Sequence, residues 1–354
     1  MITALFDIEL PIIQAPMAGS QGSALTIAVS TAGGLGSLPC AVLKPDQIRS
    51  EVEQIRAATR RPFNVNFFCH TSPPFDAARD AAWRSVLARY YEEFGVEPPA
   101  GEMSGARLPF DEGAAALIEE FRPAVVSFHF GLPRPELMAR VKATGAKVLS
   151  SATTVEEARW LEANGVDAII AQGVEAGGHR GTFLEQDLAK QAETMTLVRR
   201  TVSAVGVPVI AAGGIADAKD VAAALAAGAA GVQVGTAYLL CPEATTGRLH
   251  REALKTDAVR STVLTNVLTG RPARGIINRV MREIGPMNDA APAFPMAAAY
   301  LAPLRAAAEA LGRSDFSTMW CGQNAGGGRE APAGEITREL ASGVRPPSRG
   351  VSRG

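Results

Sequence analysis

Short apolar runs alternate with longer amphipathic segments over roughly the first 240 residues of the chain. Eight of these runs have the length and residue types of β-strands, and they cover residues 11–17, 35–40, 63–68, 124–131, 147–152, 168–173, 208–215 and 231–236. Strands that alternate with helices are typical of parallel sheets joined by crossover helices, and eight such units close a barrel. The pattern therefore predicts an α/β fold, a (β/α)8 TIM barrel, with an open doubly wound sheet as the alternative.

The helices between the strands carry their own boundary signals. Thr153 or Thr154, followed by two glutamates, resembles a capping box that opens a helix, and Gly165 stands where that helix should stop. Asp217 opens a later helix in the same way. Each predicted helix returns the chain to the start of the next strand, as a barrel requires.

The segment 70–123 interrupts this rhythm between the third and fourth strands. It contains a helix-like stretch from Asp76 to Phe94, a passage rich in proline and glycine, and a second helix. We interpret it as an elaborated loop after the third strand together with the helix that precedes the fourth.

The alternation stops after residue 239. We expect residues 1–239 to form the barrel, completed by about 311–342, while residues 240–310 read as mostly helical and form a substrate or lid domain. Residues 343–354 are rich in proline, glycine, serine and arginine, so we expect a disordered tail.

Composition limits the partners of the chain. With 47% hydrophobic residues the chain can bury a full core, and a net charge of −1 gives no basic field for nucleic acid or an anionic membrane. The N-terminus lacks the pattern of a signal peptide, and the four cysteines have no paired spacing, which favours a reducing compartment. We therefore expect a cytoplasmic protein that acts on small neutral or anionic molecules and has no metal site.

Glycines follow the last two predicted strands. Gly213 and Gly214 come after the seventh, and Gly235 with Thr236 comes after the eighth. In barrels these two loops commonly hold a phosphate, because glycine lets backbone N–H groups approach an anion; glycines that only permit tight turns are the alternative. Since no GxGxxG follows the first strand, a mononucleotide such as FMN or a sugar phosphate is favoured over a dinucleotide.

Polar side chains stand near the ends of most predicted strands. They are Gln14, Asn64, Asn66, His129, Ser150, Gln172 and Gln233, with the apolar but polarisable Met17 close to Gln14. Amides supply donors and acceptors without charge, which suits the edge of an isoalloxazine ring or of a nucleobase. A barrel interior also contains structural polar residues, so for each residue separately a structural role is the alternative.

One histidine stands apart from the other three. His179 lies in AQGVEAGGHRGT, past the end of the sixth strand and among glycines, where we expect a catalytic base. Glu175 either orients it or is solvated. His70 and His250 are expected at the surface, and His129, in an apolar strand, reads as a satisfied core residue or a neighbour of the site.

No nucleophile elbow, phosphate-binding Walker loop or metal-ligand spacing occurs, so hydrolase, kinase and zinc-enzyme functions have no support. Near the C-terminus, Trp320 and Gln323 lie among glycines. Trp320 could close the apolar wall of a substrate pocket, or it could pack the last helix onto the barrel.

These residues resemble the FMN-dependent nitronate monooxygenases, also called 2-nitropropane dioxygenases. The resemblance is carried in family order, between residues 11 and 323, by QAPMAG, STAGGLGSL, FNVNFF, VVSFHFG, AQGVEAGGHRGT, PVIAAGGIADA, GVQVGTAYL and WCGQ. The block EAGGH followed by GGI and QVGT is specific to this group of barrel flavoenzymes.

The resemblance implies roles for individual residues. His179 matches the family's catalytic histidine, which takes the α-proton of a neutral nitroalkane, and His129, Trp320 and Gln323 are candidates for the substrate pocket. The residues implied to bind or line FMN are Ala15, Pro16, Met17, Asn66, Gln172, Gly177, Gly178, Gly213, Gly214, Gln233, Val234, Gly235 and Thr236.

The reaction implied is the oxidation of an alkyl nitronate, for example propionate 3-nitronate, by FMN and O2 to a carbonyl compound and nitrite. A nitroalkane is a further substrate, and a homodimer is the expected assembly. The first alternative is an NAD(P)H-dependent quinone reductase or enoyl-thioester reductase, because these relatives share the EAGGH loop. The second is a catalytically idle flavin-binding or phosphate-binding protein, which gives His179 no function.

Overall fold

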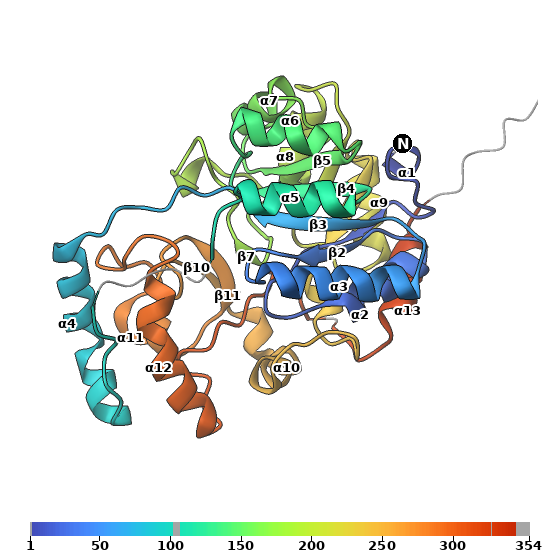
Figure 1. Ribbon diagram of the computed structural model, residues 1–354. Coiled ribbons are helices and arrows are strands. Elements are labelled where there is room, and N and C mark those ends of the chain that lie inside the picture. The colour runs from blue at the N-terminus through green and yellow to red at the C-terminus, as the bar shows by residue number, and fades with distance from the viewer. Residues whose placement is uncertain (1, 102–106, 327, 345–354) are drawn as a thin grey trace, which may run out of the picture.

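The computed structural model describes residues 2–101, 107–326 and 328–344, and its centre is a parallel barrel (Figure 1). The eight strands are β1 (Ile12–Gln14), β2 (Gly36–Pro39), β3 (Phe63–Phe68), β4 (Val125–His129), β5 (Lys147–Ala152), β6 (Ala168–Gln172), β8 (Val209–Ala212) and β9 (Gly231–Val234). They follow the order β1-β9-β8-β6-β5-β4-β3-β2. A bridge between Ile13 and Leu35, beside β2, brings the two edges together. The predicted (β/α)8 TIM barrel is confirmed.

A helix follows every barrel strand before the next strand begins, or closes the circuit after β9. These helices are α2 (Ser23–Thr31), α3 (Pro45–Ala58), α5 (Glu112–Phe121), α6 (Pro135–Ala143), α7 (Val155–Ala163), α8 (Thr194–Val202), α9 (Ala218–Ala226) and α13 (Ala333–Ala341). The predicted caps are present: Thr154 accepts from the amide of Glu157, and Asp217 accepts from two amides of α9. Gly165, with φ +84°, ends α7 as predicted.

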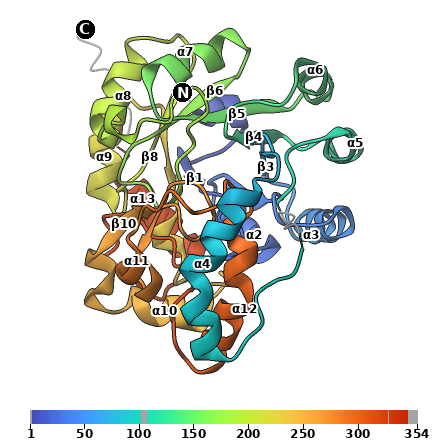
Figure 2. The ribbon, with the colours of Figure 1, turned by 90° about the vertical axis from the view of Figure 1, so that its left-hand side faces the viewer.

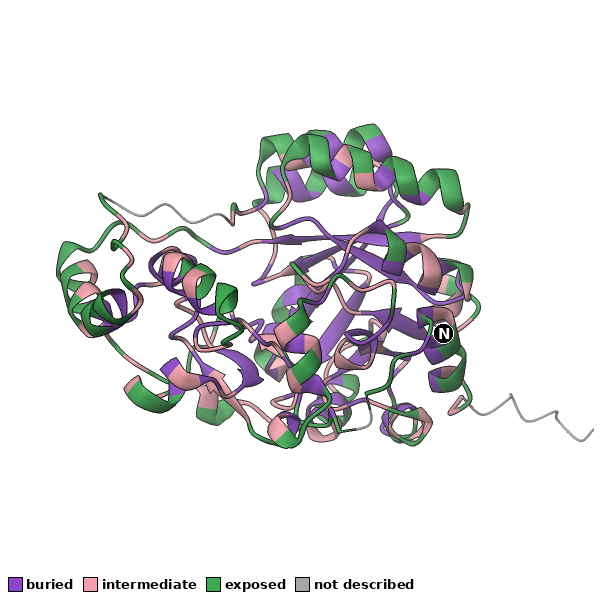
Figure 3. Cartoon of the chain, turned by 90° about the horizontal axis from the view of Figure 1, so that it is seen from below, coloured by how far each residue is buried: buried purple, intermediate pink, exposed green. Residues whose placement is uncertain are grey.

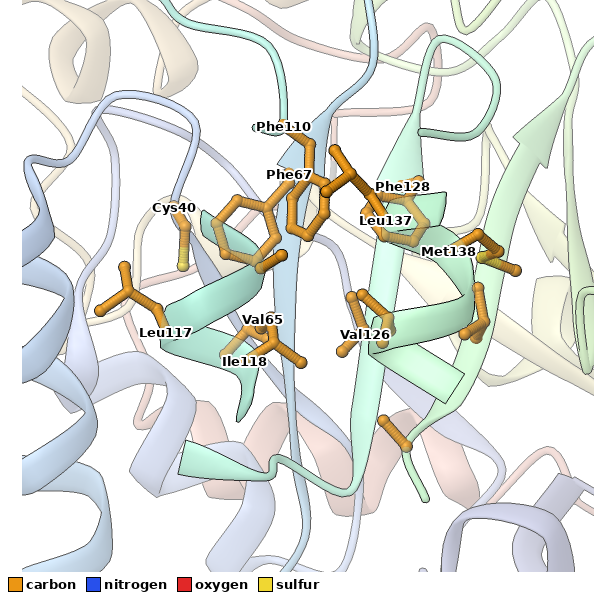
Figure 4. Close-up of a cluster of buried hydrophobic side chains, with 14 of the residues drawn as sticks. Cys40, Val65, Phe67, Phe110, Leu117, Ile118, Val126, Phe128, Leu137 and Met138 are labelled. Carbon is orange, nitrogen blue, oxygen red and sulfur yellow. The ribbon is translucent and has the colours of Figure 1, made fainter. Parts of the chain in front are cut away.

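Two apolar layers hold the barrel together. On the outside, Phe67, Phe110 and Phe128 stack edge to face, with ring centroids 5.1 Å apart in each neighbouring pair, beneath α5 and α6 (Figure 4). On the inside, Ile2 and Phe6 of the short N-terminal helix α1 (Ile2–Phe6) pack among strand residues. Each fully buried phenylalanine contributes roughly 2–3 kcal/mol, so the strands are fixed from both sides and can position the loops at their C-terminal ends.

In residues 240–310 helices outnumber strands, as expected, but the region also contains two strands that were not expected. They contain α10 (Arg248–Leu254), the 3-10 turn η3 (Asp257–Arg260), α11 (Arg279–Ile284) and α12 (Ala297–Ala310), with strands β10 (Thr262–Thr265) and β11 (Ala273–Ile276) between them. β11 pairs antiparallel with β10 and with β7 (Gly178–His179). β10 and β11 lie outside the regular strand–helix alternation that marks the barrel strands in the sequence, and β7 lies far away along the chain.

The helix expected at 76–94 is present as α4 (Ala77–Phe94), capped by Asp76. It lies beside α12, away from the barrel (Figures 1 and 2). Trp83 and Leu87 are fully buried in that contact region, and the Tyr91 hydroxyl donates to the carbonyl of Tyr300 at 2.6 Å. The segment 70–123 therefore contributes to the same lobe as residues 240–310. We use "the lobe" below for α4, α10, α11, α12, β10 and β11.

The last described helix belongs to the barrel. α13 contacts α2, α9 and β1, and Thr337 shares a 2.9 Å hydrogen bond with the hydroxyl of Tyr238 in η2 (Thr236–Tyr238). Most of the tail expected to be disordered, residues 345–354, lies outside the described residues. The domain boundaries at 239, 310 and 342 stay a proposal.

Burial follows the layered architecture. The barrel strands are almost wholly buried, and the surrounding helices expose only their outer faces (Figure 3). The remaining short turn, η1 (Leu188–Lys190), lies in the loop between β7 and α8. Within the described ranges, no helix combines the length and the apolar character needed to cross a membrane.

Candidate active site

A cavity opens at the C-terminal ends of the barrel strands, where the loops that follow them meet segment 320–324. The predicted residues that line it are Ala15, Pro16, Met17, Asn66, His129, Gln172, Gly177, Gly178, His179, Gly213, Gly214, Gln233, Val234, Gly235, Thr236 and Trp320. Gln323 is exposed and is not among the lining residues. The structure thus brings the predicted residues of the barrel loops to one place.

Glycine backbone forms the end of the cavity above β8 and β9. Gly213 (φ +123°) and Gly214 (φ +67°) have positive backbone φ angles, which residues other than glycine rarely adopt. A Cβ on Gly213 would lie 2.7 Å from Thr194 Oγ1, so any side chain would clash there. None of the amides of Gly213, Gly214 and Gly235 donates to a backbone carbonyl of a described residue. These amides are available to an anion in the cavity.

Gly235 is different because the protein itself leaves room for a side chain. Its φ of −115° is open to any residue, and a Cβ would make ordinary contacts, 3.4 Å from Ala15 Cβ and 3.5 Å from Met17 Sδ. The added atom would enter the cavity wall. Glycine at this position therefore keeps space for a bound group. We call Gly213, Gly214, Gly235 and Thr236 the glycine cradle.

Beside the cradle, the wall is neutral. The amide of Ala15 donates to Val234 O at 2.8 Å, which extends the β1–β9 ladder into the cavity rim. Asn66 donates through Nδ2 to Ser127 Oγ at 2.9 Å, and Gln233 is partly exposed on the cavity wall. Amides in such positions can face the polar edge of a planar ring.

Three of the polar strand residues do not reach the cavity. Gln14 donates to Gln21 at 2.5 Å, Asn64 donates to Ser37 and Ser127, and Ser150 donates to Gly131 O at 2.8 Å. All three are buried and lie outside the cavity lining. The suggestion that they face a ring is wrong, because their donor groups are directed to other groups of the barrel and not to the cavity.

The loop after β6 is fixed by its own side chains. Gln172 Nε2 donates to His179 O at 2.9 Å, and Gln172 Oε1 accepts from Gly181 N at 2.8 Å. The fully buried Arg180 donates to the carbonyls of Gln172 and Gly173 at 2.8 Å. Glu175 caps α8 by accepting from the amide and hydroxyl of Thr194. It therefore neither orients His179 nor is merely solvated.

His179 lies on the cavity wall within a ring of aromatic side chains. Its ring centroid is 5.2 Å from that of Phe294, 5.4 Å from that of Trp320 and 6.4 Å from that of Phe68. Its Nε2 is 2.9 Å from Thr269 Oγ1, which belongs to the turn between β10 and β11. The imidazole is therefore presented by a barrel loop and held by the lobe.

The surroundings of His179 lower the pKa of its imidazole well below the usual value. Burial is the main cause, followed by the positive charge of Arg107 and by smaller effects of His129 and Arg271. The ring is consequently neutral at pH 7, and one of its nitrogens can accept a proton.

His129 has both ring nitrogens engaged. Nδ1 lies 3.0 Å from Ser151 Oγ and Nε2 lies 3.2 Å from His179 O. Burial, with a smaller contribution from Arg271, lowers its pKa to about 3, so the ring is neutral. The structure places His129 at the cavity and also gives it the satisfied hydrogen bonds of a core residue.

The surface positions expected for His70 and His250 are wrong. His70 is 4% exposed and packs edge to face on Phe294 at 4.9 Å, and His250 is 7% exposed on α10. Burial lowers the pKa of each to about 4. Their sequence neighbours are polar or irregular, and the residues that cover them, such as Phe294 and Trp320, come from distant parts of the chain.

Two arginines near His179, Arg107 and Arg271, were not predicted to lie at the site, because nothing in their sequence neighbourhood marks them. Arg107 lines the cavity, with its guanidinium carbon 5.8 Å from the centroid of Phe294. Arg271 lies 4.0 Å over the ring of Phe130 and donates to the carbonyl of Thr182. Within the ranges that the structure describes, neither forms an ion pair with a carboxylate. The histidine side of the cavity is therefore electropositive.

The C-terminal segment completes the wall. Trp320 forms a bridge with Gly275 of β11, and Gly322 N donates to Thr236 Oγ1 at 3.0 Å. Asn324 Nδ2 donates to Gly214 O and to Asp220, both at 3.0 Å. Asn324 is a lining residue that the sequence analysis misses, although it lies next to the predicted Gln323. Of the two roles expected for Trp320, a pocket wall and the packing of the last helix, its place in the cavity lining agrees with the first.

Comparison with known proteins agrees with this geometry. The model of the family described as "Nitronate monooxygenase" matches residues 1–343. A nitronate monooxygenase of Pseudomonas aeruginosa is 43% identical over 346 residues, covering 97% of this chain and 98% of the relative. A nitronate monooxygenase of Paraburkholderia phytofirmans is 42% identical over 339 residues, covering 95% and 92%.

Two solved structures have the same architecture. Nitroalkane oxidase from Streptomyces ansochromogenes superposes with a TM-score of 0.87 at 38% identity, covering 97% of each chain. FabK from Thermotoga maritima superposes with a TM-score of 0.70 at 29% identity, covering 97% of this chain and 94% of that one. Because both the family match and these relatives cover nearly all of its length, the chain belongs to the nitronate monooxygenase family of flavin-dependent oxidoreductases.

Proposed function

We propose that the chain binds FMN in the cavity and oxidises alkyl nitronates with O2 to a carbonyl compound and nitrite. The observation that carries this proposal is the position of His179. A neutral imidazole, deprotonated at one nitrogen, shares a cavity with a backbone cradle for an anion. A base for the α-proton and a site for the cofactor's phosphate thus meet at one barrel mouth.

The residues present fit FMN. The amides of the glycine cradle would hold its phosphate, and the missing Cβ of Gly235 keeps the space open. Ala15, Pro16 and Met17 would line the ring from β1, while Gln233 and Asn66 would offer amides to its polar edge. When bound, FMN supplies the electron acceptor that no side chain of the protein can replace.

The protein's own contribution is proton transfer, orientation and charge. For a neutral nitroalkane, the free nitrogen of His179 takes the α-proton and the substrate becomes a nitronate anion. For a substrate that arrives as a nitronate, this step is not needed. Phe68, Phe294 and Trp320 exclude water from one side of the imidazole.

Charge favours a nitronate that carries a second anionic group. Arg107 lines the cavity, and burial lowers its pKa, which indicates a poorly solvated guanidinium. A buried cation gains most from a charge-assisted hydrogen bond to an anion. Propionate 3-nitronate has a carboxylate in addition to its nitronate and fits this requirement.

An NAD(P)H-dependent quinone reductase or enoyl-thioester reductase is the alternative. The likeness to FabK from Thermotoga maritima favours it. The likeness to nitroalkane oxidase is stronger in both TM-score and identity. Oxidation of a nitroalkane also requires a base for the α-proton, which is the role proposed for His179. A homodimer and a cytoplasmic location belong to the proposal as well.

Steady-state turnover of the purified flavoprotein tests the proposal. With propionate 3-nitronate, we expect O2 consumption together with nitrite release, and only slow oxidation of NADH or NADPH in the presence of a quinone or an enoyl thioester. Rapid NADH or NADPH oxidation without nitrite release from the nitronate would replace the proposed function with the alternative.

A further inference from the structure

The turn between β10 and β11 places one hydroxyl against the ring of His179. Thr269 is fully buried, and its Oγ1 lies 2.9 Å from His179 Nε2. The following residue, Gly270, has φ +90° and donates to Asn266 O at 2.7 Å. A Cβ on Gly270 would lie 2.1 Å from Pro292 O, so this turn is tightly packed. Thr269 is therefore held in place beside the imidazole.

The same hairpin also fixes the backbone around His179. In the β7–β11 pairing, His179 lies opposite Ala273 and Gly178 opposite Arg274. The next amide, that of Arg180, donates to Pro272 O at 2.8 Å. Ring and backbone of the histidine are thus positioned by one element, and that element lies outside the barrel.

The direction of the threonine hydrogen bond decides which imidazole nitrogen is free. A hydroxyl has one hydrogen to donate, and Thr269 has a second acceptor within reach, since Arg271 O lies 3.4 Å from its Oγ1. When that hydrogen is donated to Arg271 O, the oxygen of Thr269 accepts from His179, and the imidazole proton is on Nε2. Nδ1 keeps its lone pair. With the opposite direction, Nδ1 would carry the proton and the ring would have no free acceptor.

We propose that Thr269 is a positioning residue that holds His179 in the tautomer with the proton on Nε2 and the lone pair on Nδ1. The inference rests on the proposed function, because a free Nδ1 matters only where His179 accepts the substrate's α-proton. In this arrangement the general base His179, on a barrel loop, depends for its tautomer on Thr269, a side chain from the lobe.

Two substitutions at Thr269 and one control separate this role from packing. Thr269→Val removes the hydroxyl at nearly constant volume, and Thr269→Ser keeps it. Thr265 of β10 is equally buried and uses its hydroxyl only for the amide of Val267, so Thr265→Val is the matched control. Flavin content and thermal unfolding of each variant report on folding.

With nitroethane as substrate, we expect kcat/KM of Thr269→Val to fall roughly tenfold to a hundredfold, the range seen when the group that orients a metal-binding histidine is removed. Thr269→Ser and Thr265→Val should stay within about threefold of the wild type. With ethyl nitronate, all variants should stay within about threefold, because no proton is abstracted. Equal losses on both substrates, or no loss on nitroethane, would overturn the proposal.

Nitrogen NMR of histidine-labelled protein gives a readout that does not depend on turnover. The His179 signals, assigned by their absence in His179→Asn, should show a protonated Nε2 and an unprotonated Nδ1 in the wild type. Thr269→Val should shift proton population towards Nδ1. A proton on Nδ1 in the wild type contradicts the inference even if nitronate oxidation is confirmed, and failure of nitronate oxidation alone contradicts only the proposed function.

Discussion

The two ends of the cavity are built in opposite ways. The glycine cradle consists of backbone from two consecutive βα units and contains no titratable side chain. By the histidine end we mean Arg107, His129, His179 and Trp320, which line the cavity, together with Phe294, which packs against His179. These side chains come from a barrel strand, a barrel loop and three segments outside the barrel strands: the segment after α4, the segment before α12 and the C-terminal segment.

This difference between a backbone site and a side-chain site explains how one barrel can support different reactions. A backbone cradle recognises a phosphate whatever the rest of the ligand does, because its donors are fixed by strand ends and φ angles. The histidine end depends on how distant segments pack, so its residues can change without disturbing the glycine cradle. Substitutions at the two ends should therefore have separable effects.

The largest separation is expected from His179→Asn. Loss of a general base lowers kcat/KM for neutral nitroethane by about 10²–10⁴-fold. Flavin content should be unchanged, and turnover of ethyl nitronate should change by less than about fivefold. Parallel assays with the two substrates measure the effect. Normal nitroethane turnover in the variant would remove His179 from the catalytic role.

At the other end of the cavity, Gly235→Val should weaken flavin binding, because its side chain would occupy space in the glycine cradle. The first atom of the side chain meets only ordinary contacts in the protein, so the flavin-free protein should keep its unfolding free energy within about 1 kcal/mol of the wild type. Flavin affinity should fall at least tenfold, which is about 1.4 kcal/mol, as measured by fluorescence titration.

Gly247→Val is the matched control. Gly247 has φ −61° and nothing within 4 Å of its Cβ position, and it does not line the cavity. Its flavin affinity should equal that of the wild type. Retention of full flavin affinity by Gly235→Val would place the phosphate elsewhere.

Arg107→Gln tests the charge of the histidine end. A charge-assisted hydrogen bond is worth about 1.5–3 kcal/mol, so KM for propionate 3-nitronate should rise about tenfold to a hundredfold. KM for ethyl nitronate, which lacks the carboxylate, should rise much less. The control is Arg305→Gln, which removes an exposed charge whose field reaches Arg107. Equal increases for both substrates would contradict the preference for a second anionic group.

A further effect concerns the free energy of unfolding at acidic pH and not catalysis. His70 and His129 have folded-state pKa values of about 4 and about 3, below the value near 6.5 of an unfolded chain. Between these limits the unfolded state binds more protons, so the free energy of unfolding falls as pH falls from about 6.5 to about 4, by about 1.4 kcal/mol per pH unit for each histidine. Denaturant titrations of the flavin-free protein measure this slope.

His70→Phe should make that slope shallower by one histidine's contribution, because a phenyl ring suits the contacts with Phe294 and cannot take up a proton. An unchanged slope would mean that His70 titrates normally in the folded protein.

The barrel could be predicted from the sequence because its signals are local. The eight strand runs, the caps at Thr154 and Asp217 and the stop at Gly165 depend on neighbours a few residues away, and all are present in the structure. The residues of the cradle could be located for the same reason, since strand ends and glycines mark them.

The histidine end could be predicted only in part. His179 was recognisable because its glycine loop departs from any apolar pattern, yet its contact with Thr269 spans 90 residues of sequence. The burial of His70 and the position of Arg107 also depend on packing between distant segments. Strands β10 and β11 could not be predicted because they lie outside the strand–helix alternation of the barrel, and the strand that joins them to the barrel loop, β7, has only two residues.

Anaerobic mixing of the purified flavoprotein with propionate 3-nitronate tests the central claim most directly, because it brings the proposed substrate of the histidine end and the proposed cofactor of the cradle together without O2. We predict that the yellow absorbance of bound FMN bleaches at once with the nitronate and only slowly with NADH or NADPH. An unchanged spectrum with the nitronate, together with rapid bleaching by NADH or NADPH, would contradict the account.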